Sequence, residues 1–403
     1  MDVPGSRTSE VASDARVALP KVGVVAAWFD PETPGAWSGL PRGVINEFER
    51  LGVYTGFRNV TPWPPAGRIV HRWLTKTKRA GNWILSPEMR VYARFTDAAN
   101  RFATPRDVDA WLHLVGGYGR VVRGRYATLF EMSPSQLVDA AVTWRESLGY
   151  PAVTRRDMGW VARRQVGVYR HAFACCVASR WVADSLVRDH GIDAQRVHVV
   201  GYGRNVDVPP PLERDWSSPR FLFVGNDWKR KNGDAVIRAF GRVRKEVPSA
   251  RLDVVSDHPP LGVKGVVEHG QLAKRGGFAA FDPEARTDLE QLFARATCLV
   301  MPSQFEPWGL VYVEAAACGM ASIAGSIGGT ADSVGAGGII VDPHDDDAIY
   351  RAMRDLCDPD TARELGAVAH VRSASLTWAA TAQRVLASLD LGPIPGCDPA
   401  PLP

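Results

Sequence analysis

The sequence predicts an α/β protein with two doubly wound, parallel-sheet domains. Short apolar segments rich in β-branched residues alternate with amphipathic helical segments, which is typical of a parallel sheet covered by helices. The alternation occurs twice, on either side of the proline-rich stretch RNVDVPPPLERDWSSP (204–219). The length of 403 residues also exceeds what one ordinary core holds. We therefore expect two domains joined by a linker at 204–219.

The first domain is expected over residues 21–203. Its opening strand, KVGVVAAWF (21–29), is apolar throughout, as a strand buried on both faces should be. A glycine-containing loop, GAWSGLPRG (35–43), then leads into a helix that ends near Arg50. The pattern predicts further strands at 109–115, 125–130, 172–179 and 196–203, and a helix at 180–191.

The second domain is expected over residues 220–375, where the alternation is more regular. Strands are expected at 221–225, 251–256, 297–303, 321–325 and 337–343, and helices at 234–247, 286–296 and 345–357. Residues 376–390 are expected to form a C-terminal helix that returns to the first domain. We expect the N-terminal segment 1–20 to be disordered and the proline-rich tail 391–403 to be flexible.

Composition restricts the classes of function. A hydrophobic fraction of 45% and a charged fraction of 23% are typical of a soluble globular protein. The net charge of +4 is too weak to indicate a nucleic-acid partner, and none is expected. The six cysteines show no CxxC spacing, and Cys298 and Cys318 lie in apolar segments, which favours reduced thiols in a cytoplasmic protein. No run of residues has the length of a membrane span or the pattern of a signal peptide.

The segment FEPWGLVYVEAAACG (305–319) carries the first candidate site. Glu306 falls in the turn after a buried strand, and a helix is expected to begin near Pro307 or Gly309. The free N–H groups of a first helical turn suit hydroxyl or phosphate oxygens. Glu314 lies further along the same helix and can reach a second diol of one ligand. The alternative is that Glu306 caps the helix and Glu314 pairs with a nearby base.

The segment FLFVGNDWKRKNG carries the second candidate site. Lys229, Arg230 and Lys231 stand where a strand ends and a helix begins, so they can hold a diphosphate through the arginine fork and the lysine charge. A solvated run of charges is the alternative. The loop 35–43 lacks the GxGxxG spacing of a dinucleotide fold, so an NAD site is poorly supported.

These segments, with VASRWVADSLVRDHGIDAQRVHVV (177–200) and SIGGTADSV (326–334), make the chain similar to retaining GT-B glycosyltransferases of family 4, the glycosyl transferases group 1. That family carries two glutamates separated by seven residues, which Glu306 and Glu314 match. It also carries a basic pair after the first strand of the second domain, which Arg230 and Lys231 match. The resemblance spans roughly residues 21 to 390 and is strongest from 172 to 345.

The resemblance implies two Rossmann-like domains that face a central cleft, and a hexosyltransferase that needs no metal and no other cofactor. Glu306 is implied to contact hydroxyls of the transferred sugar, and Glu314 the ribose of the nucleotide. Arg230 and Lys231 are implied to neutralise the diphosphate. A UDP-sugar donor is expected in preference to a GDP-sugar. The remaining donor contacts are implied for Pro307, Trp308, Gly309, Leu310, Val311 and Gly39. The acidic run 345–347 is expected to cap a helix rather than bind a metal.

The chain departs from the family pattern in two places. Many relatives have a histidine in the first-domain loop that touches the donor sugar, whereas ATLFEMSPS has Glu131 there. Ser38, His113 and Glu131 are therefore expected on the sugar or acceptor side, with a core position as the alternative for His113. The Gly-Arg pair that usually precedes the basic motif is Gly225–Asn226 here, so Arg230 is expected to take over the arginine's role.

The stretch RIVHRWLTKTKRAGNW (68–83) combines basic and aromatic residues. It is compatible with peripheral contact at the inner face of an anionic membrane, or with a plain solvated helix. The expected reaction moves a sugar to an acceptor hydroxyl by a front-face route with retention. The alternatives are an enzyme of other chemistry on the same fold (an epimerase, a phosphorylase or a pseudo-glycosyltransferase) and a catalytically silent sugar-nucleotide-binding protein. The sequence specifies neither the acceptor nor the oligomeric state.

Overall fold

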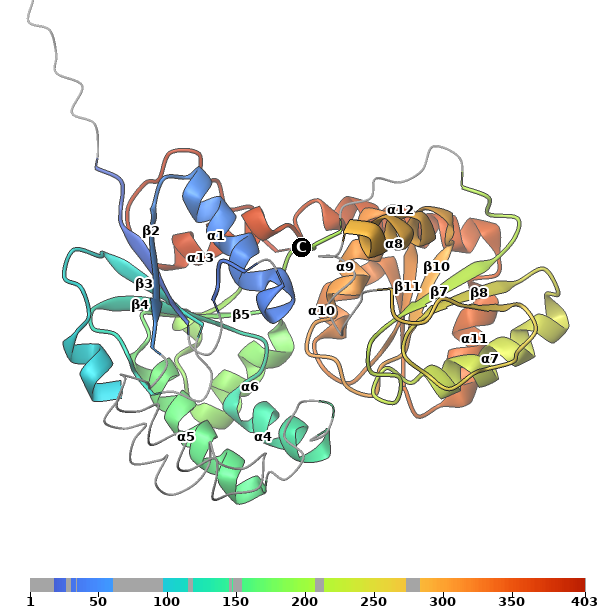
Figure 1. Ribbon diagram of the computed structural model, residues 1–403, viewed down its shortest axis with the longest axis horizontal. Helices are drawn as coiled ribbons and strands as arrows, with labels where there is room; N and C mark the ends of the chain where they lie inside the picture. The colour runs from blue at the N-terminus through green and yellow to red at the C-terminus, as the bar shows by residue number, and fades with distance from the viewer. Residues whose placement is uncertain are drawn as a thin grey trace, which may run out of the picture.

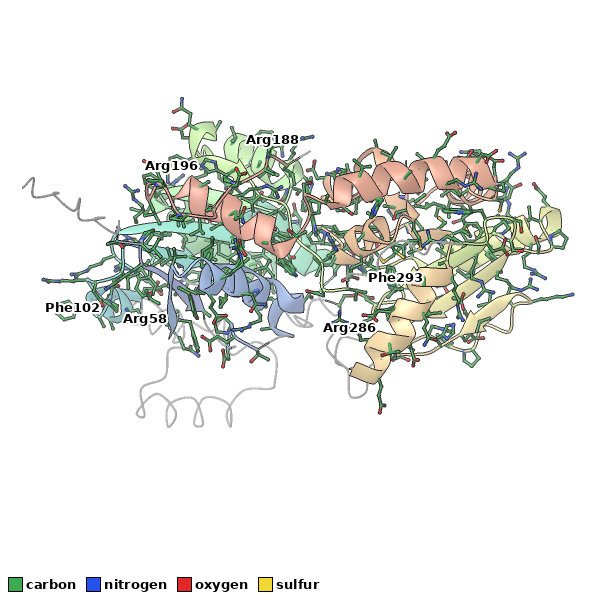
Figure 2. The ribbon with its side chains drawn as sticks, turned by 90° about the horizontal axis from the view of Figure 1, so that it is seen from above. Arg58, Phe102, Arg188, Arg196, Arg286 and Phe293 are labelled. Carbon is green, nitrogen blue, oxygen red and sulfur yellow. The ribbon has the colours of Figure 1, made fainter. Side chains whose placement is uncertain are left out.

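Two six-stranded parallel sheets lie side by side, one in each half of the chain (Figure 1). The computed structural model describes residues 18–26, 30–33, 35–60, 97–114, 119–144, 147, 154–206, 214–272 and 283–402. Seen from above, Arg188 and Arg196 belong to the first half and Phe293 to the second (Figure 2). The prediction of a two-domain α/β protein with doubly wound parallel sheets is confirmed.

The first sheet has the strand order β2-β1-β3-β4-β5-β6, and every neighbouring pair is parallel. Its strands are β1 (Val22–Ala26), β2 (Tyr54–Asn59), β3 (Ala110–His113), β4 (Arg125–Phe130), β5 (Ala174–Val177) and β6 (Val197–Val199). The named helices in the described part of this half include α1 (Leu40–Arg50), α4 (Pro134–Thr143), α5 (Arg155–His171) and α6 (Arg180–His190). Strand β1 is buried along its whole length, as its apolar sequence predicts.

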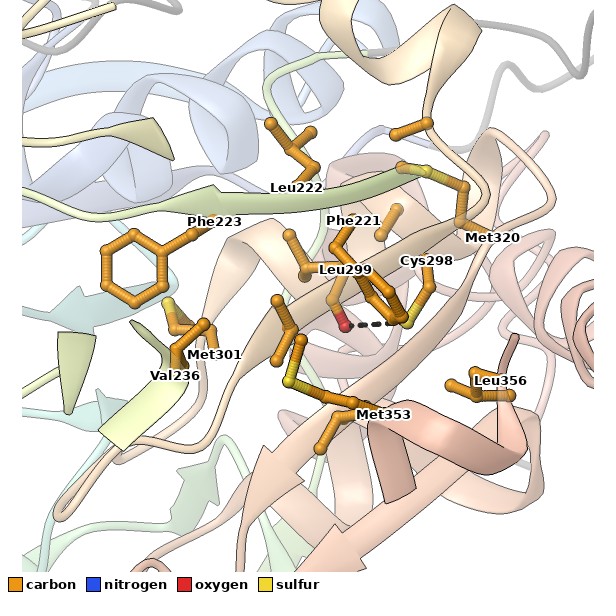
Figure 3. Packing of buried hydrophobic residues seen from close by; sticks show 14 of the residues in the cluster. Phe221, Leu222, Phe223, Val236, Cys298, Leu299, Met301, Met320, Met353 and Leu356 are labelled. Atoms are coloured by element: carbon orange, nitrogen blue, oxygen red, sulfur yellow. Dashed lines mark hydrogen bonds between the residues drawn. The ribbon is translucent and has the colours of Figure 1, made fainter. Parts of the chain in front are cut away.

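The second sheet has the order β12-β11-β10-β7-β8-β9 and is also parallel throughout. Its strands are β7 (Arg220–Val224), β8 (Arg251–Val255), β9 (Val266–Glu268), β10 (Cys298–Met301), β11 (Ala321–Gly325) and β12 (Gly338–Val341). Its helices are α7 (Gly233–Glu246), α8 (Pro283–Arg295), α9 (Leu310–Ala317), α10 (Thr330–Val334), α11 (Asp346–Asp355) and α12 (Pro359–Ser373). Phe221, Leu299 and Met353 are fully buried in its core (Figure 3).

The strand order of the second sheet determines where a ligand site is expected. From β7 the chain builds outward through β8 and β9, and it then returns to place β10 on the other side of β7. The loops that leave the carboxyl ends of β7 and β10 therefore diverge at a topological switch point, where open α/β sheets bind their ligands. Arg230 and Lys231 follow β7, and Glu306 follows β10.

The chain crosses from the first half to the second near residues 200–206 and returns in helix α13 (Trp378–Ser388), which packs against α1 (Figure 1). A Cβ atom on Gly43 of α1 would lie 2.3 Å from the Trp378 ring. A Cβ atom on Gly203 would lie 2.1 Å from the Trp378 backbone nitrogen. Glycine at both positions thus allows the crossing segment, α1 and α13 to meet closely.

The C-terminal tail does not behave as expected, because residues 391–402 pack against the first domain. Ile394 is buried in the first-domain core, and Arg384 Nε donates to the Ala400 carbonyl at 2.7 Å. Arg50 Nη2 donates to the Gly396 carbonyl at 3.2 Å. The prolines misled the prediction, since buried apolar side chains and satisfied carbonyls hold an irregular segment in place.

Some sequence expectations fall outside the described residues. These are the basic and aromatic stretch 68–83, the segment 1–17 and residues 207–213 of the expected linker. Among the helices of the described ranges, none has the length and apolar composition needed to cross a bilayer.

Candidate functional site

The loops that follow β7 and β10 are joined by Asn232. This residue has a left-handed backbone with φ of 67°, a conformation that asparagine tolerates better than most residues. Its side-chain nitrogen donates to the carbonyls of Pro302 and Pro343 at 3.2 and 2.7 Å. Gln304 Nε2 donates to its side-chain oxygen at 3.2 Å. The two loops are therefore held in one arrangement at the switch point.

A cluster of charges lies between these loops, and its members are Asp227, Arg230, Lys231 and Glu306. Lys231 Nζ donates to Glu306 Oε2, and Arg230 Nη1 lies 3.6 Å from the same oxygen. Arg230 also donates to the Phe305 carbonyl at 2.9 Å and, through Nε, to Asp227 Oδ2 at 3.0 Å. The structure thus brings together the three residues for which the sequence implies a catalytic role. Lys229, the third base of the run, is exposed.

Burial and the neighbouring charges shift the pKa values of Glu306 and Lys231 in opposite directions. Burial raises the pKa of Glu306, but the charges of Lys231 and Arg230 outweigh it and the net pKa lies below the ordinary value. Burial lowers the pKa of Lys231, although Glu306 opposes that change. The Lys231 and Glu306 side chains are 12% and 9% exposed, so their mutual attraction is little screened by water. An incoming anion would find two cations here that are already desolvated.

The SIGG segment of 326–334 fixes the backbone of Glu306. The Glu306 N–H donates to the Ile327 carbonyl at 3.1 Å, and the Gly329 N–H donates to the Glu306 carbonyl at 3.0 Å. Gly328 has φ of 120°, and a Cβ atom there would lie 2.0 Å from the Glu306 carbonyl oxygen. Glycine at position 328 is therefore required by the close approach of the two backbones.

Helix α9 begins at Gly309, as the sequence predicts. Gly309 is the N-cap with φ of 79°, and a Cβ atom there would lie 2.5 Å from the Tyr312 ring. The first N–H groups of a helix have no partner within the helix, so those at Leu310 and Val311 are suited to an anion beside Glu306. The side chain of Trp308 is only 2% exposed and packs on Tyr202, with ring centroids 5.9 Å apart. The structure therefore gives the Trp308 side chain a packing role rather than a donor contact.

Glu314 is tied to the crossing segment instead of to a base. Its Oε1 accepts a hydrogen bond from the Asn205 backbone N–H at 3.3 Å. The Asn205 side chain donates to the Ser38 carbonyl at 2.7 Å and accepts from Trp378 Nε1 at 3.0 Å. Burial raises the pKa of Glu314 to about 7, against the backbone N–H groups of Asn205 and Val206. We call the set Glu314, Asn205, Ser38 and Trp378 the Asn205 junction.

The loop before α1 is strained. Trp37, Ser38 and Gly39 adopt left-handed backbone conformations in succession, with φ of 43°, 54° and 85°. For Trp37 and Ser38 this costs roughly 1–2 kcal/mol each. Such strain persists only where the surroundings enforce it, and the bond from Asn205 to the Ser38 carbonyl contributes to that. The predicted donor-side and acceptor-side residues Gly39 and Ser38 thus lie at the Asn205 junction.

Glu131 directly follows β4, and its side chain is exposed to solvent, with atoms of neighbouring segments close enough to desolvate it in part. These surroundings raise its pKa to about 7, and the charge of Glu306 adds to the increase while Arg230 and Lys231 oppose it. The first-domain carboxyl group therefore lies near the charge cluster of the second domain.

His113 lies in the core of the first domain. The imidazole on β3 is 0% exposed and packs beside Tyr126 and Phe130, with ring centroids 5.7 and 6.3 Å away. Burial lowers its pKa to about 4. The expected sugar-side or acceptor-side role of His113 is therefore wrong, and the core alternative holds.

Two contacts between the domains were not anticipated from the sequence. The Arg180 backbone N–H at the start of α6 donates to Asp332 Oδ2 of α10 at 2.5 Å, and Arg180 Nη1 lies 3.7 Å from Asp332 Oδ1. The rings of Trp181 and Phe305 meet edge to face, with centroids 5.9 Å apart. The helix N-terminus of one domain is thus capped by a carboxylate of the other.

The acidic run 345–347 has the role expected of it. The Asp345 side chain accepts hydrogen bonds from the N–H groups of Asp347 and Ala348 and so caps α11. Within the described ranges, no three His, Cys, Asp or Glu side chains are grouped so as to hold a metal ion.

Comparison with known proteins relates the second half of the chain to glycosyltransferases. Residues 218–358 match the family model described as glycosyl transferases group 1. A D-inositol 3-phosphate glycosyltransferase of Corynebacterium diphtheriae is 29% identical over 222 residues, which are 50% of this chain and 52% of that protein. An alpha-maltose-1-phosphate synthase of Mycolicibacterium smegmatis is 28% identical over 252 residues, 56% of this chain and 64% of that protein. The chain thus aligns with about half to two thirds of the length of these relatives.

Solved structures match nearly the whole chain. Sucrose-phosphate synthase from Thermosynechococcus elongatus covers 91% of this chain and 98% of its own, with a TM-score of 0.61 and 18% identity. Anabaena HepE in complex with UDP and glucose covers 92% and 99%, with a TM-score of 0.60 and 13% identity. At these identities the likeness is one of fold. The chain therefore has the GT-B fold, and its residues 218–358 are similar to the glycosyl transferases group 1.

Proposed function

We propose that the protein is a retaining glycosyltransferase of family 4 that moves a hexosyl group from a nucleoside-diphosphate sugar to an acceptor hydroxyl. The observation that carries the proposal is the buried cluster of Arg230, Lys231 and Glu306 at the switch point of the second sheet. Two desolvated cations beside a helix N-terminus suit a diphosphate leaving group, and a carboxylate beside them suits sugar hydroxyls.

The cluster provides the positive charge that departure of a diphosphate requires. In the proposed reaction the bond between the anomeric carbon and the phosphate oxygen breaks while Arg230 and Lys231 stabilise the developing negative charge. The acceptor hydroxyl attacks the same face of the sugar, and its proton passes to the leaving phosphate oxygen. Glu306, which the SIGG segment fixes, orients the sugar through its hydroxyls. Glu314 is proposed to bind the ribose by exchanging its bond to the Asn205 N–H for ribose hydroxyls.

A thermal-shift panel tests the donor. UDP, GDP and ADP are compared with UDP-glucose, UDP-galactose, UDP-N-acetylglucosamine, GDP-mannose and ADP-glucose. A ligand at 100 times its Kd raises the unfolding free energy by about 2.7 kcal/mol. We expect the UDP series to shift the melting temperature of the wild type, and the shift to disappear in Lys231→Ala. The absence of any nucleotide-dependent shift would contradict the proposal.

Reaction products separate the remaining alternatives. Incubation with the stabilising nucleotide sugar and a panel of polyol and sugar-phosphate acceptors is followed by NMR of the anomeric proton. The relatives' printed activities, toward an inositol phosphate and in the synthesis of a maltose phosphate, make phosphorylated polyols and sugars the first acceptors to test. A product with the donor's anomeric configuration supports retention. An epimerised nucleotide sugar without transfer would indicate the epimerase, and binding without turnover the silent protein.

We propose that this reaction needs no metal. The cluster and the start of α9 supply the positive field beside the diphosphate. Turnover is therefore expected to persist after dialysis against EDTA. Loss of activity in EDTA that magnesium or manganese restores would overturn this part of the proposal.

A further inference from the structure

The described part of the C-terminal tail ends where the chain passes between the two domains (Figure 1). Two segments make this passage. The crossing segment, residues 200–206, leads into the second domain, and residues 374–377, here called the return segment, lead from α12 back to α13. A rotation of one domain against the other has to be absorbed by the backbone of both segments. A contact that joins the two segments therefore affects how far the domains can open.

The side chain of Arg384 in α13 joins both segments to the tail. Its Nη1 donates to the Val200 carbonyl of the crossing segment at 2.8 Å, and its Nη2 donates to the Ser375 carbonyl of the return segment at 2.8 Å. From the tail, the Ala400 carbonyl accepts from Nε at 2.7 Å and the Pro401 carbonyl accepts from Nη2 at 3.3 Å. Arg384 is only 8% exposed, so water reaches its N–H groups poorly. The tail carbonyls thus satisfy part of a buried charge at the crossing.

Leu402 adds an apolar contact at the same place. Its side chain packs against the buried cluster that contains Tyr202 of the crossing segment and Trp308 of the second domain. A Cβ atom on Gly201 would lie 2.7 Å from Leu402 Cδ1 and 3.6 Å from the Trp308 ring. Trp308 directly precedes Gly309, the N-cap of α9. Leu402 therefore belongs to an apolar cluster that both domains share.

The tail residues depend on these contacts, because residues 391–402 form neither helix nor strand. Val200 directly follows β6, and Ser375 lies between α12 and α13, so both are also held by regular structure. A segment without a hydrogen-bond ladder of its own detaches with far less free energy than global unfolding requires. Residues 400–402 can thus leave the crossing while the two domains remain folded.

We propose that residues 400–402 act as a strap that holds the crossing and return segments together and so limits the opening of the two domains. With the strap in place, the Arg384 guanidinium is satisfied by all three segments, and Leu402 packs in the shared cluster. When the strap detaches, Arg384 loses two acceptors and water enters between the segments, which then move apart more easily. The inference goes beyond the proposed function, since it concerns domain motion and holds for any ligand of the cleft.

The test uses Leu402→Ser in the full chain without ligand. Hydrogen exchange followed by mass spectrometry is expected to be roughly tenfold faster in peptides that cover residues 200–206 and 374–377, since burial of a leucine side chain shifts an equilibrium by about that factor. The peptide that covers β8, in the core of the second domain, should keep its wild-type rate. Small-angle scattering should give a larger radius of gyration than for the wild type.

Two further variants serve as controls. Leu402→Met preserves an apolar side chain of similar volume, so exchange and radius of gyration should stay close to those of the wild type. Val371→Ser removes an apolar side chain from α12 that is 77% exposed, and it should change neither measurement. Arg384 itself is left unchanged, because its replacement removes contacts to three segments at once and risks loss of the fold.

Three results would overturn the strap. Unchanged exchange at 200–206 and 374–377 in Leu402→Ser would show that the tail does not hold these segments. Equally faster exchange in β8 would indicate a general loss of stability instead of a local release. Faster exchange at both segments with an unchanged radius of gyration would show that the tail orders the segments without limiting the opening of the domains.

Discussion

A buried charge stays ionised only while a group of opposite charge remains beside it, and Lys231 and Glu306 depend on each other in this way. Asp227 gives Arg230 a second acidic partner, so Arg230 depends less on Glu306 than Lys231 does. In the proposed function, binding of a diphosphate is therefore an exchange of anions around Lys231. The same dependence lets single substitutions distinguish the ligand role of each group from its structural role.

Replacing Lys231 by alanine is expected to lower turnover by roughly 10²-fold or more and to weaken binding of UDP, because a donor to the leaving group is lost. Removing one partner of a buried pair also costs about 3–5 kcal/mol unless the other is neutralised, so the unfolding free energy should fall. Steady-state kinetics, calorimetry and urea unfolding measure the three effects. Lys229→Ala is the matched control, because Lys229 is exposed in the same loop. Wild-type turnover in Lys231→Ala would contradict the assignment.

A separate prediction concerns Glu314 and the pH dependence of the unfolding free energy. Its pKa is about 7 in the folded protein and 4.5 for the ordinary group, so the protonated form is favoured by folding. This contribution is fully present below pH 4.5 and is lost as the pH rises through 7. The unfolding free energy of Glu314→Gln minus that of the wild type should therefore increase by about 2–3 kcal/mol between pH 5 and pH 8. Urea titrations at both values test this, and a constant difference would contradict it.

At the scale of elements, the site is built from loops whose positions are set by the strands before them. Glycines allow the backbones of these loops to approach each other closely. The loop after β11 forms hydrogen bonds with the loop after β10, and Gly328 lies at their closest approach. The conformation of Glu306 is thus set by a neighbouring loop as well as by its own.

Substituting Gly328 by alanine should displace the Glu306 loop. A φ of 120° strains alanine by about 1–3 kcal/mol, and the added Cβ would lie 2.0 Å from the Glu306 carbonyl oxygen. Gly56→Ala separates these effects, because Gly56 has φ of 105° and no atom within 4 Å of an added Cβ. Both variants should lose stability. Only Gly328→Ala should also lose turnover, on the order of 10²-fold, as expected for a misplaced catalytic group. Equal turnover in the two variants would contradict this.

The sequence predicts those elements in which all residues share one environment, such as strands that are buried on both faces. The buried strands β1, β4 and β10 are predicted because both of their faces are apolar. Strand β2, YTGFRN, is missed because it lies at the sheet edge, is partly exposed along much of its length and contains a glycine. Helix α5 is missed because its five arginines obscure its apolar stripe.

The same distinction applies to the site. Arg230, Lys231 and Glu306 are predictable, since each follows the end of a buried strand within a recognisable motif. Asn205 is not predictable, because its segment has the composition of a linker. Its contacts to Ser38 and Trp378 also join residues that are far apart in the chain. The burial of His113 follows from the packing of β3 between its neighbours, which a short sequence window does not reveal.

At the scale of the whole molecule, the two domains contact each other at the Asn205 junction and at α6. The bond from the Arg180 N–H to Asp332 is made only when the start of α6 faces α10. This arrangement also brings Glu131 near the charge cluster.

Asp332→Ala should weaken this contact while the second-domain cluster remains intact. A charge-assisted hydrogen bond is worth about 1.5–3 kcal/mol, so kcat/KM should fall by roughly tenfold or more. Affinity for UDP alone should not change. Small-angle scattering should give a larger radius of gyration than for the wild type. The control is Asp184→Ala, which removes an exposed acid from α6, the helix whose N-terminus Asp332 contacts. An unchanged radius of gyration with unchanged kcat/KM would show that the contact is dispensable.

The return of α13 to the first domain has a consequence for how the protein is made. Ala382, Val385 and Leu386 of α13 share a buried cluster with Val44 and Phe48 of α1. A ribosome synthesises this helix only after the entire second domain. The second domain can therefore fold as one continuous stretch while the first, although it emerges earlier, still exposes the apolar surface that α13 covers. The order of completion of the two cores is thus the reverse of the order in which the domains begin.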